Sequence, residues 1–332
     1  MSETLLNVQN LHTSFFTDNG EVQAVNGVSF QLNPGEILGI VGESGSGKSV
    51  TAYSIMQILA DTGRITEGKI LFKGEDLTTW SEKKMQSFRG KNCSIIFQDP
   101  MTSLNPVFTI GSQLKEAVVL HTNRRGAEAD ARVIELLEAV GINEPEKRMK
   151  QYPFEHSGGM RQRVMIAMAL ACEPDILIAD EPTTALDVTI QAQILELIQS
   201  LQKKMGMAVI LVTHDLGVIA DMCDNIVVMY GGRICERGTA REIFYNPKHE
   251  YTKGLLRSIP NVNNMKERLI PIEGTPINML NLPKGCAFCP RCDAAMKICL
   301  QEVPEEIVIN EDHKAACWMN IKAAYEEVSR NE

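Results

Sequence analysis

The sequence is poor in aromatic residues and lacks long runs of apolar residues. Phe, Trp and Tyr make up 5% of its 332 residues, which argues against a surface that binds single-stranded nucleic acid by stacking bases on aromatic rings. A membrane-spanning helix needs about 20 consecutive apolar residues. The most apolar stretches, Val164 to Cys172 and Ala208 to Val212, reach at most half that length. The sequence therefore predicts no membrane span.

The sequence also lacks an excess of basic residues and a visible secretory signal. Its 33 Lys and Arg against 42 Asp and Glu give a formal charge of −9, so we expect no nucleic-acid partner. The N-terminal residues Met1 to Thr4 contain neither the basic nor the apolar region of a signal peptide. We therefore expect a cytosolic chain. Thiols stay reduced there, so the nine cysteines indicate buried thiols or metal ligands more than disulfides.

Apolar segments alternate with segments of helical periodicity over residues 1–240. Expected strands include Glu36–Val41 and Ile176–Ala179, and an expected helix covers Asp130–Val140. Strands separated by helices predict an α/β fold with a parallel core.

The cysteines are concentrated near the C-terminus. Four are scattered over the first 240 residues, whereas the other five lie between Cys286 and Cys317. The intervening segment Asn246–Lys284 holds five prolines and little periodicity, as connecting segments do. We therefore expect a larger domain over residues 1–240 and a C-terminal extension over residues 241–332.

A glycine-rich loop follows the expected strand Glu36–Val41 and precedes an expected helix. It matches the pattern G-x-x-x-x-G-K-[ST] of a phosphate-binding loop. The glycines let backbone N–H groups point at phosphate oxygens, the lysine reaches the β- and γ-phosphates, and the final hydroxyl binds Mg²⁺. The expected ATP-binding residues are Gly42, Glu43, Ser44, Gly45, Ser46, Gly47, Lys48 and Ser49.

Two acids end the apolar strand Ile176–Ala179. A buried strand would deliver them to the carboxyl edge of the sheet, where phosphates bind. We assign Asp180 to Mg²⁺ and Glu181 to the attacking water, as its general base.

A second helix start suited to an anion lies upstream of these acids, at Ser157, Gly158, Gly159 and Met160. One ATP does not easily satisfy two such sites within one monomer. We therefore expect this segment to complete the phosphate site of a facing subunit.

Together these motifs resemble the nucleotide-binding subunits of ATP-binding cassette (ABC) transporters. The resemblance covers roughly residues 5–238 and adds three elements in the family's order: Gln98, the segment Ala185 to Asp187, and His214. The signature differs from the family's Leu-Ser-Gly-Gly-Gln at His156 and Met160, while its serine and two glycines are present.

The resemblance implies a fold and further site residues. The fold is a RecA-like parallel sheet with an antiparallel β subdomain and a helical subdomain at about 99–165, followed by a small Cys-rich region. Gln98 would contact Mg²⁺ and the attacking water, His214 the γ-phosphate, and Asp187 would lie in a loop that crosses the dimer interface. Phe15 would stack on adenine, with Phe16 as the alternative.

The C-terminal thiols have the spacing Cys286-x5-Cys292-x6-Cys299-x17-Cys317, with Cys289 inside the first interval. Such spacing indicates a soft metal or an iron–sulfur cluster. The spacing of Cys286, Cys289 and Cys292 also fits part of a zinc knuckle. The tail resembles D-type ATPases of oligopeptide and dipeptide permeases, notably at His249–Leu256. That resemblance implies a [4Fe–4S] cluster on Cys286, Cys292, Cys299 and Cys317, with Cys289 spare.

The resemblance predicts an ATP-hydrolysing subunit of a peptide importer, peripheral on the cytoplasmic face of the inner membrane. Its expected partners are a second ABC ATPase in a heterodimer, two transmembrane permease subunits and an extracytoplasmic peptide-binding protein. Two alternatives stay open: an importer of another solute such as nickel or glycosides, and a soluble ABC ATPase that acts on DNA or ribosomes. A soluble ABC ATPase of that kind would need a long coiled-coil insertion or a second cassette, and the sequence contains neither.

Overall fold

The computed structural model describes residues 4–184, 186–259 and 271–321. Ala185 and part of the expected connecting segment lie outside these ranges. Contacts divide the chain into two compact units. The first contains residues 33–36 and 79–212, and the second contains residues 4–32, 37–78 and those from 213 onward. The described part of the C-terminal extension thus belongs to the second unit, and a boundary near residue 240 stays a prediction.

The first unit is built on three parallel strands. They are β6 (Cys93–Ile96), β7 (Ile176–Asp180) and β8 (Ala208–Thr213), paired in the order β8-β7-β6. Every residue of β7 and β8 is buried. A parallel strand covered on both faces needs apolar side chains on both faces, which explains the apolar run that predicted β7.

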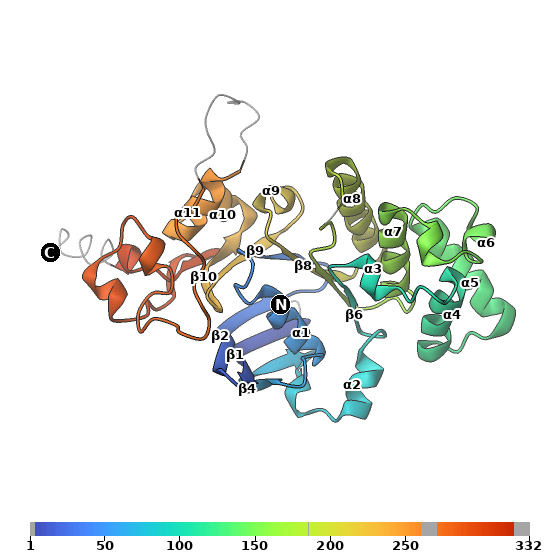
Figure 1. Ribbon diagram of the computed structural model, residues 1–332, viewed down its shortest axis with the longest axis horizontal. Coiled ribbons are helices and arrows are strands. Elements are labelled where there is room, and N and C mark those ends of the chain that lie inside the picture. The colour runs from blue at the N-terminus through green and yellow to red at the C-terminus, as the bar shows by residue number, and fades with distance from the viewer. Residues whose placement is uncertain (1–3, 185, 260–270, 322–332) are drawn as a thin grey trace. The chain divides into compact units, whose positions relative to one another are not determined.

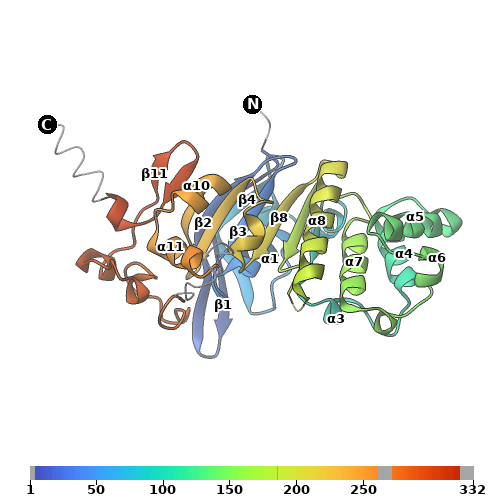
Figure 2. The same cartoon turned by 90° about the horizontal axis from the view of Figure 1, so that it is seen from above.

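Among the described residues of the first unit, seven α-helices surround or extend this sheet. They are α2 (Glu82–Phe88), α3 (Pro100–Ser103), α4 (Ile110–His121), α5 (Gly126–Ala139), α6 (Pro145–Arg148), α7 (Gly158–Ala169) and α8 (Val188–Met205). Helices α4, α5 and α6 lie side by side next to α7 (Figures 1 and 2). Helix α5 contains most of the helix expected at Asp130–Val140, and its face with Val133 and Leu137 is buried.

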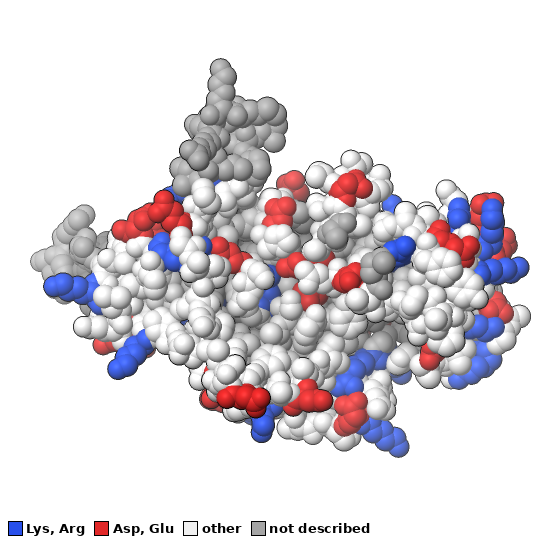
Figure 3. All heavy atoms as spheres, in the orientation of Figure 1, with Lys and Arg blue, Asp and Glu red and all other residues white. Residues whose placement is uncertain are grey.

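Basic and acidic side chains are interspersed over α4, α5 and α6 on the face that Figure 3 shows. One pair joins α4 to α5, with 2.7 Å between Lys115 Nζ and Asp130 Oδ1. Exposed pairs of this kind contribute little to stability. Among the described residues on this face, the mixed signs do not form the uniform positive surface that attracts nucleic acid.

The second unit contains an antiparallel sheet. Its strands run in the order β2-β1-β4-β5 and are β1 (Leu6–Thr17), β2 (Gly20–Leu32), β4 (Gly63–Phe72) and β5 (Glu75–Asp76). Helix α1 (Lys48–Met56) packs against β1, β2 and β4.

A second group of strands in this unit follows the order β11-β12-β10-β9-β3. They are β3 (Ile37–Val41), β9 (Asn225–Tyr230), β10 (Arg233–Thr239), β11 (Ile307–Asn310) and β12 (His313–Ala315). Strands β3 and β9 are parallel and the other pairs are antiparallel. Gly231 and Gly232 turn the β9–β10 hairpin at φ values of 56° and 76°, which L-residues adopt at a cost.

The C-terminal segment is fastened to β10 through a buried carboxylate. Glu236 accepts hydrogen bonds from the backbone N–H groups of Lys248 (2.6 Å) and His249 (2.9 Å) and contacts His313 Nε2 at 2.7 Å. Burial alone would raise the pKa of Glu236, but these hydrogen bonds hold it below its ordinary value. One side chain thus joins β10 to β12 and to the start of α11 (Glu250–Arg257).

Helices α9 (Leu216–Ile219) and α10 (Ala240–Tyr245) complete the described part of this unit. The described residues of the chain also contain four short 3₁₀ turns: η1 (Leu77–Thr79), η2 (Pro153–Glu155, in the first unit), η4 (Cys289–Arg291) and η5 (Lys297–Leu300). The C-terminal segment lies beside α10 and α11 in both ribbon views (Figures 1 and 2). In the described parts of the chain, no helix combines the length and apolar character that crossing a membrane requires.

Candidate functional site

The phosphate loop connects β3 to α1, as the sequence predicts. At Gly42 an added Cβ would collide with the carbonyl oxygen of Met229, and at Gly47, with φ of 99°, one would collide with that of Ala24. Glycine is therefore required at both positions, because another part of the backbone lies too close for a side chain and because φ is positive. The loop residues Ser44 and Gly45 are exposed at its tip.

The loop curls around the ammonium group of Lys48. This side chain is 4% exposed, and its Nζ donates to the carbonyl oxygens of Gly42 (2.7 Å) and Glu43 (3.0 Å). Ser49 follows in the first turn of α1. A positive helix end and a lysine at one loop suit a phosphate group.

The acid pair follows β7 in the first unit. Asp180 ends the strand at 1% exposure. Glu181 takes a φ of 46°, a left-handed conformation that costs a non-glycine residue about 1–2 kcal/mol. Its backbone N–H donates to Val212 O at 2.8 Å, which holds it in this turn. Strained residues of this kind cluster at functional sites.

The structure brings Gln98 to Glu181. Gln98 follows β6, and its Nε2 donates to Glu181 Oε2 at 2.7 Å. Thr184 Oγ1 donates to the same oxygen at 3.0 Å. These two donors orient the carboxylate that we assign to the attacking water. The sequence analysis did not single out Thr184, although a hydroxyl three residues after an acid is a local signal for such a contact.

The signature segment begins α7. Ser157 caps the helix by accepting from Met160 N–H at 3.4 Å, and Ser157 and Gly158 are exposed. A Cβ on Gly159 would approach Ile190 Cγ2 within 2.9 Å, so the glycine permits close packing of α7 on α8. Asp187 caps α8 by accepting from Ile190 N–H at 3.1 Å. The tips of both helices therefore lie next to each other.

The departure at His156 falls on a core position. The ring is 3% exposed, and neither nitrogen has a hydrogen-bond partner among the described residues. Burial, assisted by the charge of Arg148, lowers the pKa of His156. A neutral buried ring packs beneath the signature rather than at its exposed tip.

Three further expected residues lie in the second unit. His214 follows β8 and is exposed. Phe15 on β1 is half-buried, and its ring covers Gly63 of β4. Phe16 is 39% exposed with the guanidinium of Arg64 4.4 Å from its ring centroid. Adjacent strand residues point to opposite faces of the sheet, so Phe15 and Phe16 do not face the same side. Which of the two rings stacks on adenine stays a prediction.

The C-terminal cysteines share one segment. Cys286 N–H donates to Cys299 O at 2.8 Å, and Met296 N–H donates to Cys299 Sγ at 3.4 Å. In the described residues, no three or more His, Cys, Asp or Glu side chains are arranged to hold a metal ion. The [4Fe–4S] cluster that the family resemblance implies therefore stays a prediction.

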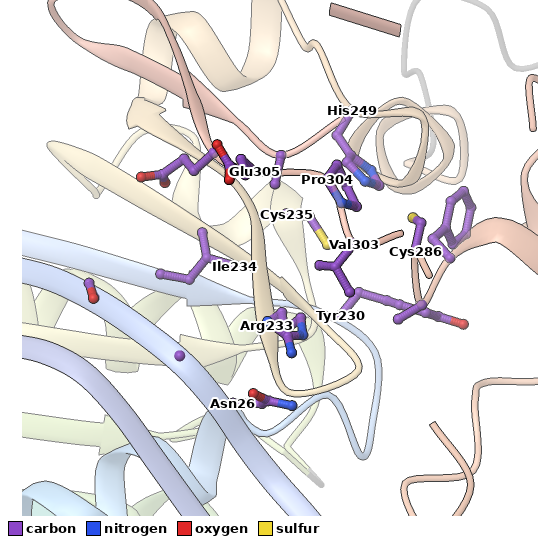
Figure 4. Close-up of a pocket in the computed structure, with 16 residues that line it drawn as sticks. Asn26, Tyr230, Arg233, Ile234, Cys235, His249, Cys286, Val303, Pro304 and Glu305 are labelled. Carbon is purple, nitrogen blue, oxygen red and sulfur yellow. The ribbon is translucent and has the colours of Figure 1, made fainter. Parts of the chain in front are cut away.

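A cavity of about 410 Å³ borders the same segment within the second unit. Figure 4 shows Cys235 of β10 and Cys286 with their side chains at this cavity, together with Arg233 and Asn26. The remaining described lining residues are Gly27, Ser29, Tyr230, Ile234, His249, Ala287, Phe288, Val303, Pro304, Glu305, Glu306 and Ala316.

Comparisons with known proteins agree with the motifs. Residues 25–184 match the family model for ABC transporters, and residues 235–299 match the model for the C-terminal region of oligopeptide/dipeptide transporters. The chain is 53% identical to the dipeptide transport ATP-binding protein DppD of Bacillus subtilis, over 97% of this chain and 96% of that protein. It is 52% identical to the oligopeptide transport ATP-binding protein OppD of Escherichia coli, over 92% and 90%.

Solved structures show the same fold. A dimeric ATP-binding cassette in a post-hydrolysis state with ADP and phosphate aligns with a TM-score of 0.64 and 26% identity, over 71% of this chain and 99% of that one. The cassette CbiO1 of Clostridium perfringens aligns with a TM-score of 0.63 and 29% identity, over 74% and 92%. The expected α/β cassette fold is confirmed.

Proposed function

The chain belongs to the ATP-binding subunits of ABC transporters for oligopeptides and dipeptides, and we propose from this membership that it hydrolyses ATP to drive peptide import. The observation that carries the proposal is the 53% identity to a dipeptide transport protein over 97% of the chain. Peptides are favoured over nickel or glycosides because the relatives named above transport dipeptides and oligopeptides. ATP is the substrate, and Mg²⁺ accompanies it in this family.

The family resemblance implies a division of roles within the chain. Lys48 and the backbone N–H groups of the phosphate loop would hold the phosphates, while Ser49, Asp180 and Gln98 would hold Mg²⁺, which neutralises phosphate charge when bound. Glu181 would accept the proton of the attacking water. Its hydrogen bond from Gln98 (2.7 Å) supports this role, because a fixed carboxylate needs less reorganisation during the reaction.

Half of each ATP site would come from a facing cassette. The exposed tip of α7 at Ser157 and Gly158, next to Asp187, supports its use by another subunit's nucleotide. ATP would hold two cassettes together, and hydrolysis would release them. We propose that the second cassette is a related but different chain, as in D-type subunits.

The chain works with membrane permease subunits, as its family does. We propose two such subunits, an extracytoplasmic peptide-binding protein, and a peripheral location on the cytoplasmic face of the inner membrane. Purification of the tagged chain from solubilised membranes is expected to recover two permease subunits and a second cassette, identified by mass spectrometry. In vesicles with the receptor, peptide rather than nickel or a glycoside should stimulate ATP hydrolysis. Recovery of ribosomes or DNA without permeases would contradict the proposal.

We also propose a [4Fe–4S] cluster on Cys286, Cys292, Cys299 and Cys317. Burial raises the pKa values of Cys286, Cys292 and Cys317, and hydrogen bonds from backbone groups of Phe288, Ala294 and Met319, respectively, offset part of this rise. Hydrogen bonds to sulfur are a means by which proteins stabilise and tune such clusters. The described side chains are not arranged around a metal ion, so the proposal rests on the cysteine spacing, the family resemblance and these hydrogen bonds.

Electrostatic coupling supports the choice of four among the five cysteines. Burial raises the pKa of Cys286 to about 12 and of Cys292 to about 11, and charge on Cys299 and Cys317 adds to each shift. For Cys289 the corresponding charge comes from Cys299 alone. Cys299 and Cys317 thus both act on Cys286 and Cys292, whereas only Cys299 acts on Cys289.

Replacing Cys292 by Ser is expected to remove nearly all the iron from anaerobically purified protein, because one lost thiolate leaves a cluster with three ligands. Iron analysis and the visible absorbance band measure this loss. Cys289→Ser is the matched control and should retain iron. Zinc in place of iron, or wild-type protein without either signal, would overturn the assignment.

A further inference from the structure

The segment from Cys286 to Cys317, which we call the Cys-bearing segment, contacts the phosphate loop through an arginine. Arg291 lies on η4, between Cys289 and Cys292. Its Nη1 and Nη2 donate to the two carboxylate oxygens of Glu43, at 2.5 Å and 3.0 Å. The side chain of Arg291 is 5% exposed and that of Glu43 is 25% exposed. This two-bond geometry is the strong form of an arginine–carboxylate pair, and its burial limits screening by salt.

Arg291 is itself held in place on the C-terminal side. Its Nε donates to Glu273 O at 2.9 Å, and its Nη2 donates to Ile272 O at 3.2 Å. Tyr230 Oη lies 3.4 Å from Nη1. The guanidinium is therefore a fixed group rather than a flexible surface side chain, and it transmits the position of this segment to Glu43.

A second contact reaches the same loop residue from α11. The backbone N–H of Glu43 donates to Tyr251 Oη at 2.7 Å. Tyr251 is fully buried and packs against Tyr230 and Phe288, with ring centroids 4.7 Å and 5.2 Å away. Both the main chain and the side chain of Glu43 are thus held by residues beyond position 250.

The position of Glu43 also affects Lys48. The carbonyl oxygens of Gly42 and Glu43 accept from Lys48 Nζ, so a shift of Glu43 moves the acceptors of the ammonium group. The Glu43 carboxylate is a negative charge in a loop for a negative ligand, and Arg291 offsets it. Loss of Arg291 would therefore disturb the loop and leave a charge that repels phosphate.

We propose that Arg291 and Tyr251 are positioning residues for the phosphate loop, through which the C-terminal extension sets the affinity of the chain for ATP. The proposal rests on the proposed function only in taking this loop as the ATP site. It assigns the C-terminal extension a role in nucleotide binding, in addition to any metal that its cysteines hold.

The test is titration of the purified full chain with a fluorescent ATP analogue and Mg²⁺. Arg291→Gln is expected to weaken binding about tenfold, since a charged hydrogen-bonded partner is lost. The double variant Glu43→Gln with Arg291→Gln should recover most of this loss, because it also removes the repelling charge. A purely structural role of Arg291 predicts no such recovery. Tyr251→Phe should weaken binding about threefold, as one neutral hydrogen bond is lost.

Arg237→Gln is the matched control. Arg237 also forms a two-bond pair with a glutamate in the same unit, through Nε and Nη2 to Glu306 at 2.6 Å each, and its Nη1 donates to Ser29 O at 3.1 Å, which lies outside the phosphate loop. It should bind the analogue like the wild type. Iron content measured in parallel should be unchanged in Arg291→Gln, which separates a loop effect from loss of a cluster.

Wild-type affinity for Arg291→Gln, or no recovery in the double variant, would overturn the proposal. If Arg291→Gln does not fold, as judged by circular dichroism, Tyr251→Phe decides, and unchanged binding there would overturn it. Failure of the wild-type chain itself to bind the analogue would instead contradict the proposed function.

Discussion

Replacing Glu181 by Gln is expected to stop steady-state ATP hydrolysis while ATP binding persists. The amide keeps the size of the side chain but does not accept the proton of the attacking water. General-base catalysis contributes about 10²- to 10⁴-fold to a rate, so kcat should fall about a thousandfold. Phosphate release measures the rate, and titration with a fluorescent ATP analogue measures binding.

The chain offers a matched control for this substitution in Glu173. This glutamate also has a left-handed backbone, with φ of 54°, and it forms an exposed ion pair with Arg132 at 2.8 Å. Glu173→Gln should therefore reproduce any backbone effect of the change without loss of activity. Turnover of Glu181→Gln within tenfold of the wild type would show that another group activates the water.

Replacing Lys48 by Ala is expected to weaken ATP binding itself. The ammonium group is buried within the loop and would donate charged hydrogen bonds to the phosphates, each of which contributes about 1.5–3 kcal/mol. The loss also leaves the carbonyl oxygens of Gly42 and Glu43 without this donor. Affinity for the fluorescent analogue should fall about a hundredfold, and hydrolysis at moderate ATP concentration should fall with it.

Lys84→Ala controls for the loss of a lysine elsewhere. Its Nζ lies 3.6 Å from the ring centroid of Trp80, outside the phosphate loop. This variant should bind ATP as the wild type does. If Lys48→Ala bound equally well while retaining its fold, the loop would not hold phosphate in the proposed way.

The local elements were the predictable part of the fold. The buried run at β7, the glycine-rich turn before α1 and the apolar face of α5 each depend on residues close in the sequence, so periodicity and turn chemistry specify them. The helix bounds differ by a few residues from those expected, since capping and packing decide where a helix ends. The division into units was less predictable, because contacts rather than composition define it.

The sequence by itself determined which residues carry the chemistry: the phosphate loop, the acid pair and the signature helix are contiguous segments whose residue types dictate their conformations. Tertiary structure alone decided which distant residues contact them. Gln98 bonds to Glu181 across 83 residues, and Arg291 bonds to Glu43 across 248. Such contacts depend on strand order and on the packing of distant segments, and neither leaves a periodic signal in the chain.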